Sequence, residues 1–189
     1  SYETILQFIL SANNNMKRIH LSLRKMSERY GELVGEVDGE KYYSLPSAEV
    51  LSKVSVDELK EHCSVGYRNK ALVDFANDIV NERFVVEEAE KMSDDELFSY
   101  LLNLYGVGDK VAQCIMLFGF HRWSAFPVDV WIDKIMNALY PDELSEYAKT
   151  KNLKKITRLL IKDFGKERFG KYAGFAQQLL FVYAREIKK

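Results

Sequence analysis

The stretch Leu104-Tyr105-Gly106-Val107-Gly108-Asp109-Lys110-Val111-Ala112-Gln113-Cys114 joins two segments whose apolar residues have helical spacing. Two glycines around one aliphatic residue fit a tight turn between helices, because glycine takes a positive φ without a Cβ clash. Such a turn leaves backbone N–H groups at the start of the second helix, where they and the helix dipole attract a phosphate. An ordinary interhelical turn has the same pattern. The stretch alone therefore predicts a helical hairpin and leaves phosphate binding open.

Helical spacing also dominates the rest of the chain, so the predicted fold class is all-α. Capping-box patterns at Ser55–Glu58 and Ser93–Glu96 predict two helix starts. We expect helices over two stretches joined through 11–15, after 66–68, and over 94–104, 110–120, 129–140, about 152–164 and about 170–187. Residues 41–45 are too short to carry a sheet. At 189 residues, the chain suits one domain or two small helical lobes around a cleft.

Composition narrows the function classes. The formal net charge of −1 gives no bulk sign of nucleic-acid binding, so any DNA contact must be local. Two cysteines, Cys63 and Cys114, fit a reducing compartment and exclude a four-cysteine cluster or Cys-rich zinc site within this chain. We expect no metal, no cofactor, no membrane span and no signal peptide. The chain opens on an apolar helical pattern without Met, so we expect the natural protein to continue upstream.

Two residues in or near this hairpin carry candidate chemistry. Lys110 falls in the first turn of the second predicted helix, and Asp129 follows nineteen residues later in Phe126-Pro127-Val128-Asp129-Val130. Taken singly, a lysine on a helix is usually solvated, and an Asp before an apolar helix is usually an N-cap.

The combination resembles the helix–hairpin–helix (HhH-GPD) superfamily of base-excision DNA glycosylases, and within it the 8-oxoguanine DNA glycosylases. Five segments carry the resemblance, in order, along nearly the whole chain: Ser11-Ala12-Asn13-Asn14-Asn15, Gly66-Tyr67-Arg68, Lys110-Val111-Ala112-Gln113-Cys114, Pro127-Val128-Asp129-Val130 and Tyr172-Ala173-Gly174-Phe175-Ala176-Gln177. The resemblance implies one catalytic unit over 1–189, with the hairpin at about 94–120. It also implies a DNA glycosylase and abasic-site lyase that acts on duplex DNA containing a damaged base, as a monomer, in a nucleoid or nucleus.

The resemblance implies a mechanism. Lys110 is expected to attack C1′ of the damaged nucleotide, and the resulting Schiff base permits β-elimination. The attacking amine must be neutral, and partial burial beside a helix N-terminus favours that form. Asp129 is expected to stabilise the positive charge that develops on the sugar.

Binding roles follow in the same way. The flipped base is expected to lie between Cys114 and Phe181, near Gln177 and the Pro127 carbonyl. Without the resemblance, Phe181 and Cys114 would be interpreted as core residues. The opposite cytosine is expected to meet Asn13, Arg18 and Arg68, with Tyr67 as a wedge; the alternatives are a polar turn and surface charges. Phosphate contacts are expected from the backbone N–H groups of Gly106, Gly108 and Val111.

The sequence departs from the family pattern at a few positions. Trp131 and Ala184 replace a histidine and its acidic partner, which we interpret as a coupled change, and Tyr105 replaces a common Pro. In the family, an N-terminal domain commonly supplies the backbone carbonyl that recognises the N7–H of 8-oxoguanine. We find no segment of that kind in this chain. A run of cations at Lys149, Lys151, Lys154, Lys155, Arg158 and Lys162 is interpreted as a solvated face. Alternatives are a glycosylase for another lesion, a non-catalytic DNA-binding module and an inert helical domain.

Overall fold

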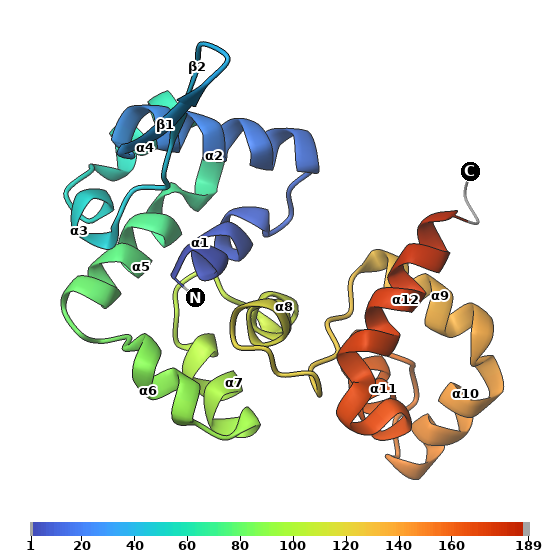
Figure 1. The fold of residues 1–189 in the computed structure, drawn as a ribbon. Helices are drawn as coiled ribbons and strands as arrows, with labels where there is room; N and C mark the ends of the chain where they lie inside the picture. Colours follow the sequence, from blue (N-terminus) through green and yellow to red (C-terminus); the bar gives the residue numbers. More distant parts are fainter. Residues whose placement is uncertain (1, 187–189) are drawn as a thin grey trace. The chain divides into compact units, whose positions relative to one another are not determined.

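The computed structural model describes residues 2–186, and these form two compact helical units that meet in sequence between Gly108 and Asp109 (Figure 1). The elements of the first unit are α1 (Tyr2–Ser11), α2 (Met16–Tyr30), β1 (Leu33–Val37), β2 (Glu40–Tyr43), α3 (Ala48–Leu51), α4 (Val56–Cys63), η1 (Gly66–Arg68), α5 (Asn69–Val80), α6 (Val86–Lys91) and α7 (Asp94–Leu102). Those of the second unit are α8 (Asp109–Gly119), α9 (Val130–Leu139), α10 (Pro141–Thr150), α11 (Arg158–Phe169), η2 (Gly170–Tyr172) and α12 (Ala173–Glu186). The predicted all-α class is confirmed.

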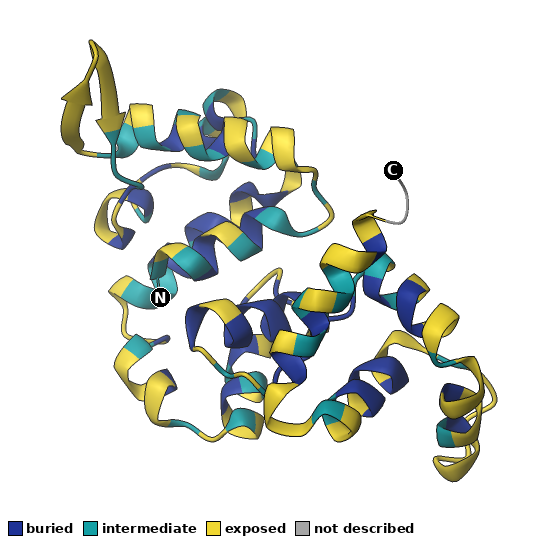
Figure 2. Ribbon diagram, turned by 45° about the vertical axis from the view of Figure 1, so that its right-hand side comes forward, coloured by how far each residue is buried: buried dark blue, intermediate teal, exposed yellow. Residues whose placement is uncertain are grey.

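The core of the first unit forms where α1, α2, α4 and α5 pack together. Their apolar residues recur at helical spacing, so each helix has one buried stripe and one exposed stripe (Figure 2). On α1 the buried stripe is Ile5, Leu6, Ile9 and Leu10. Burying each such side chain contributes about 1.5–3 kcal/mol, which is what holds these short helices in place.

Serine caps start two helices of the first unit where the sequence predicts them. Ser93 and Glu96 form a complete capping box at the start of α7. Ser55 accepts the Glu58 backbone N–H at 3.1 Å, but the carboxylate of Glu58 does not return the bond. It accepts the Tyr30 hydroxyl instead, at 2.9 Å, and this ties α4 to α2. The predicted capping box at Ser55 is therefore half right.

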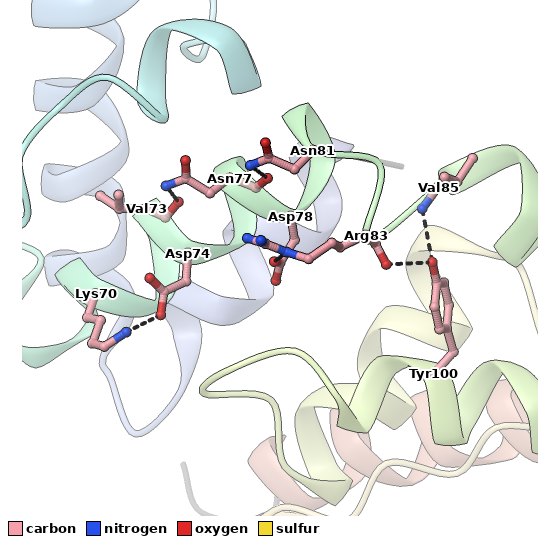
Figure 3. Close-up of polar contacts among 9 residues, drawn as sticks. All are labelled: Lys70, Val73, Asp74, Asn77, Asp78, Asn81, Arg83, Val85 and Tyr100. Carbon is pink, nitrogen blue, oxygen red and sulfur yellow. Dashed lines mark hydrogen bonds and ion pairs between the residues drawn. The ribbon is translucent and has the colours of Figure 1, made fainter.

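The turn after α5 is fixed by one phenol from α7 (Figure 3). The Tyr100 hydroxyl accepts the Val85 backbone N–H and donates to the Arg83 carbonyl, both at 3.1 Å. Arg83, which follows α5, also pairs with Asp78 of that helix at 2.7 Å. Tyr100 stacks on Phe84, so the same residue supplies packing and polar contacts. These contacts explain why the chain leaves α5 and enters α6 within a few residues.

A two-stranded antiparallel hairpin corrects the prediction that no sheet forms near residue 41. β1 and β2 pair from Val37–Glu40 to Leu33–Tyr43, and all of β1 is exposed. Asp38 and Gly39 both have positive φ, 53° and 82°, as a tight two-residue hairpin turn requires. Strand alternation was the wrong signal here because neither face is buried. The Asp-Gly pair was the usable one.

The second unit has its own apolar core, built by α9, α10, α11 and α12 around Phe126, Ile132, Met136 and Leu144. Two glycines allow close approach, because a Cβ on Gly165 would lie 2.6 Å from the Phe126 ring and one on Gly174 would lie 2.4 Å from Leu117. These contacts bring the segment before α9, and helix α8, against the helices that follow.

The helix expected at about 152–164 is wrong in its limits. Pro141 begins α10, which runs to Thr150, and Asn152 then takes a left-handed φ of 54°. The next helix, α11, begins only at Arg158 behind the N-cap Thr157, whose side chain accepts the Leu160 N–H. The continuous lysine-rich run hid this break. The predicted last helix does form over 173–186, after a short 3₁₀ turn, and residue 187 lies outside the described residues.

No helix within residues 2–186 combines the length and the apolar composition that a bilayer crossing needs.

Candidate active site

Lys110, Cys114 and Asp129 come together in the second unit. Lys110 is the second residue of α8 and is partly buried, and Cys114 lies one turn further along the same helix with 5% of its surface exposed. The Lys110 side chain and the Asp129 carboxylate are both close enough to the Cys114 thiol to influence its pKa. The structure thus brings the two predicted catalytic residues to one place, around a shared cysteine.

The thiol at this place is held in its neutral form. Burial raises the pKa of the Cys114 thiol, while the Lys110 side chain opposes that rise and the Asp129 carboxylate adds to it. A thiol with a raised pKa is a poor nucleophile near neutral pH, because the thiolate is the reactive species. The raised pKa therefore argues against Cys114 as the attacking group.

Asp129 is the N-cap of α9, as the cautious interpretation of the sequence predicted. One carboxylate oxygen, Oδ1, accepts the backbone N–H groups of Trp131 and Ile132, both at 2.9 Å. Among the described residues, none donates a hydrogen bond to Oδ2. The capping bonds fix the side chain and leave one oxygen for a substrate, so capping and an electrostatic role are compatible at this residue.

The two groups expected to bind the edge of the flipped base are bonded to each other. Gln177 of α12 is 4% exposed, and its Nε2 donates to the Pro127 carbonyl at 2.9 Å. Its Oε1 accepts from Gln178 at 2.6 Å. A base that binds here has to replace these bonds with its own, which buried polar groups require. The amide of Gln177 is thereby held in one orientation before any ligand arrives.

Phe181 lies one turn further along α12 and is partly buried. It packs against the apolar core of the second unit, as the core interpretation predicted, and the Arg185 guanidinium lies 5.6 Å from its ring centroid. Its remaining exposure leaves part of the ring for contact with a ligand.

The residues expected at the opposite base gather in the first unit. Asn13 has a left-handed φ of 47° in the turn between α1 and α2. Tyr67, in η1, is 65% exposed, and its hydroxyl donates to the Ala12 carbonyl at 3.2 Å. Arg18 of α2 is exposed and close enough to Arg68 to affect its pKa. Two short segments that are about fifty residues apart in sequence, one with Asn13 and Arg18 and one with Tyr67 and Arg68, therefore lie together in the first unit.

Arg68 differs from the other three because it is buried, with 4% of its surface exposed. Its Nε donates to the Ala12 carbonyl at 2.7 Å, and its two terminal nitrogens donate to the carbonyls of Asn13 at 2.5 Å and Val65 at 3.4 Å. Burial lowers the pKa of Arg68, the Tyr67 phenol opposes this, and Arg18 adds to the lowering. A guanidinium remains protonated despite such a shift. In this structure Arg68 shapes the turn that presents Asn13.

The predicted phosphate-binding groups lie in the segment that joins the units. Gly106 has a φ of 84°, and a Cβ there would come within 2.9 Å of Ala71. Of the two glycines in this turn, Gly106 has a positive φ and Gly108 does not. Apart from its neighbours in the chain, a Cβ added at Gly108 would meet no described atom within 4 Å. Val111 is the third residue of α8, where backbone N–H groups lack intrahelical acceptors.

One member of the basic run was misread. Lys162 is buried, and its Nζ lies 2.6 Å from Oδ2 of Asp109, the residue before Lys110. Spacing within α11 cannot show this, because the partner is 53 residues away. The sequence did offer one indication of this pair. Asp109 is an acidic residue in the first turn of the predicted helix, where its carboxylate could bind a cation from elsewhere in the chain.

The sequence matches a family model, and the fold matches solved structures. The model is that of the HhH-GPD superfamily base excision DNA repair protein, and it covers residues 6–159. The N-glycosylase/DNA lyase of Saccharomyces cerevisiae is 30% identical over 95% of this chain and 54% of its own length. The N-glycosylase/DNA lyase OGG1 of Arabidopsis thaliana is 33% identical over 95% of this chain and 49% of its own length.

A solved structure of the Clostridium acetobutylicum 8-oxoguanine glycosylase/lyase, with double-stranded DNA containing cytosine opposite 8-oxoguanine, is also similar. It is 37% identical, has a TM-score of 0.88, and is matched over 100% of this chain and 60% of its own. The chain thus spans about half to three-fifths of the length of these relatives. The family model, which covers most of the chain, decides the assignment: this chain belongs to the HhH-GPD superfamily of base excision DNA repair proteins.

Proposed function

We propose that this chain is the catalytic part of an 8-oxoguanine DNA glycosylase with abasic-site lyase activity. The observation that carries the proposal is that the partly buried Lys110 and the carboxylate of Asp129 lie near the same buried Cys114 thiol, whose pKa burial raises. An amine in that position suits covalent catalysis at a sugar carbon, and a fixed carboxylate suits a developing positive charge. The relatives named as N-glycosylase/DNA lyases support the same reaction class.

The reaction follows from these groups. The neutral amine of Lys110 attacks C1′, and the electrons of the glycosidic bond leave with the base, which takes up a proton. Opening of the sugar ring gives an imine between Nζ and C1′. Loss of a C2′ proton then expels the 3′ phosphate by β-elimination, because the protonated imine accepts the electron pair. Asp129 stabilises the positive sugar through Oδ2, while its Oδ1 remains bonded to the start of α9.

The flipped base is proposed to bind among residues of α8, of α12 and of the segment before α9. Chemistry at C1′ requires the nucleotide to leave the stack, and the extruded base needs polar contacts along its edge. Gln177 and the Pro127 carbonyl supply one donor and one acceptor that are already aligned with each other. Cys114 and Phe181 are proposed to cover the two faces of the base. These assignments rest on the resemblance together with the burial of the four residues.

The first unit is proposed to hold the opposite strand. Asn13 and Arg18 offer donors to an unpaired cytosine, and the exposed ring of Tyr67 suits a wedge between bases. Gly106, Gly108 and Val111 are proposed to bind a phosphate through backbone N–H groups. A monomer acting on one lesion in duplex DNA, in a nucleoid or nucleus, completes the proposal.

Borohydride trapping tests the enzyme directly. The chain is incubated with a duplex that contains one 8-oxoguanine opposite cytosine, and borohydride reduces any imine to a stable adduct. We expect an adduct with the native chain and none with Lys110→Gln. Lys134→Gln, which removes an exposed lysine of α9, is the matched control and should trap at the native rate.

Three outcomes separate the alternatives. No adduct and no released base, with intact DNA binding, would identify a non-catalytic DNA-binding module. Trapping on a duplex with another damaged base, but not with 8-oxoguanine, would move the substrate to that lesion. Base release without an adduct would show a glycosylase that uses water, and it would contradict the role of Lys110.

A further inference from the structure

The start of α8 is held by a second lysine. Lys162 of α11 has 8% of its side chain exposed, and its Nζ lies 2.6 Å from Oδ2 of Asp109, whose side chain is 45% exposed. Asp109 is the first residue of α8 and directly precedes Lys110. A buried ammonium is unfavourable unless it is paired, and this short, charge-assisted bond provides the pairing.

Stability alone is a weak reason to keep such a pair. Replacing a buried ion pair by well-packed apolar side chains of similar volume is often neutral or stabilising, because two charges no longer lose their hydration. Apolar residues already surround Lys162 on its helix, where Leu160, Ile161 and Phe164 are buried. The position could therefore have carried one more apolar side chain, and the cation points to a role that needs charge.

The rest of α8 has other anchors. The side-chain oxygen of Gln113 accepts the Phe126 backbone N–H at 3.0 Å, and Leu117 lies against Gly174 of α12. Both contacts lie beyond the first turn, which carries Lys110. For that first turn, the bond between Asp109 and Lys162 is the described polar link to α11.

We propose that the Asp109–Lys162 pair positions Lys110, by holding the first turn of α8 and by keeping the local charge balanced. This inference rests on the proposed function, in which Lys110 is the nucleophile. Lys162 and Asp109 touch no reacting atom in this scheme, so they are positioning residues.

Charge balance gives the pair a distinctive signature. The titratable and charged groups around this turn include Asp109 and Cys114 on α8, Asp129 at the start of α9, and Lys162 on α11. Removing the Lys162 charge leaves the Asp109 carboxylate unbalanced, and this favours the protonated, unreactive amine. Removing the Asp109 charge leaves the Lys162 cation unbalanced and favours the neutral amine. The two changes therefore act in opposite directions on the same nucleophile.

The test measures the single-turnover rate of borohydride trapping from pH 5 to pH 10 for Lys162→Met and Asp109→Asn. Arg158→Met is the matched control, since it breaks an exposed ion pair between α11 and Asp133 of α9. We expect Lys162→Met to trap about tenfold more slowly at pH 7, with its rate midpoint moved to higher pH by about half a unit. The midpoint of Asp109→Asn should move to lower pH, and that of Arg158→Met should not move.

Several results would overturn the inference. Unchanged midpoints in both variants, or shifts in the same direction, contradict a charge-balancing pair. Lower melting temperatures with native trapping rates show a purely structural ion pair. If Lys162→Met does not fold, Asp109→Asn decides the matter, because its side chain is nearly half exposed. If the native chain forms no adduct, the proposed function itself is contradicted. If the native chain forms the adduct and both variants trap at the native rate, only this inference is contradicted.

Discussion

The two units place their candidate functional groups on different kinds of structure. In the second unit, Lys110 lies in the first turn of α8, and Asp129 is the N-cap of α9, fixed by its bonds to two backbone N–H groups of that helix. In the first unit, Asn13 lies in the turn between α1 and α2 and Tyr67 in the short helix η1, and the buried guanidinium of Arg68 joins the two segments. The difference indicates that the proposed catalytic residues and the proposed opposite-base residues are held in place by separate sets of contacts. Substitutions in one unit should therefore change the rate, and those in the other should change the choice of partner base.

Among these substitutions, removing the charge of Asp129 should have the largest effect, because it should lower the reaction rate without changing DNA binding. Asn also caps helices, so Asp129→Asn keeps the bonds to α9 while removing the carboxylate. We expect the single-turnover rate to fall about 10²–10³-fold with DNA affinity nearly unchanged, since only the transition state carries the sugar charge. Asp129→Ser, another capping residue, is the control for geometry and should lose as much. A rate within threefold of native for Asp129→Asn would contradict the electrostatic role.

Substitutions of Arg68 and Arg18 should distinguish a structural role from a role in recognising the opposite base in the first unit. Arg68→Met strands three backbone carbonyls, and we expect it to destabilise the chain by about 2–3 kcal/mol, measured by urea unfolding. Arg18 is exposed, so Arg18→Met should leave stability unchanged and reduce discrimination for cytosine opposite the lesion by about 1–3 kcal/mol. The discrimination of both variants is measured with duplexes that differ only in the base opposite the lesion. The reverse pattern, with Arg18 structural and Arg68 neutral, would contradict this account.

The two glycines before α8 should give the smallest effects. Gly106→Ala forces a Cβ into a left-handed conformation 2.9 Å from Ala71, so we expect a loss of about 1–2 kcal/mol in stability. Gly108→Ala meets nothing within 4 Å and should unfold like the native chain. Its added methyl group instead weakens DNA binding a few-fold if a phosphate approaches there. Melting temperatures and affinities at two salt concentrations distinguish the cases.

Local signals in the sequence predicted much of the helical frame. The start of α7 was readable because Ser93 and Glu96 satisfy each other within four residues, and Asp129 was readable as a cap for the same reason. The hairpin of β1 and β2 was missed because the prediction relied on alternation and ignored Asp38-Gly39. The start of α11 was missed because its lysine-rich approach keeps a helical composition across a break at Asn152.

The candidate site was predictable as a set of residues, and its contacts were not. Resemblance grouped Lys110 with Asp129, but the bonds of Arg68 to the turn at Ala12 cross 55 residues or more of sequence. The burial of Lys162 depends on Asp109, 53 residues away. Such long-range pairs leave no periodic trace, because each partner alone has the pattern of a surface charge.

Locating the trapped sugar tests the central claim most directly. The native chain is trapped with borohydride on the 8-oxoguanine duplex, digested, and mapped by mass spectrometry to the modified residue. The account predicts one adduct, on Lys110, and its disappearance in Lys110→Gln without transfer to another amine. An adduct on Lys162 or on any other lysine in the native chain would contradict the assignment of Lys110 as the nucleophile.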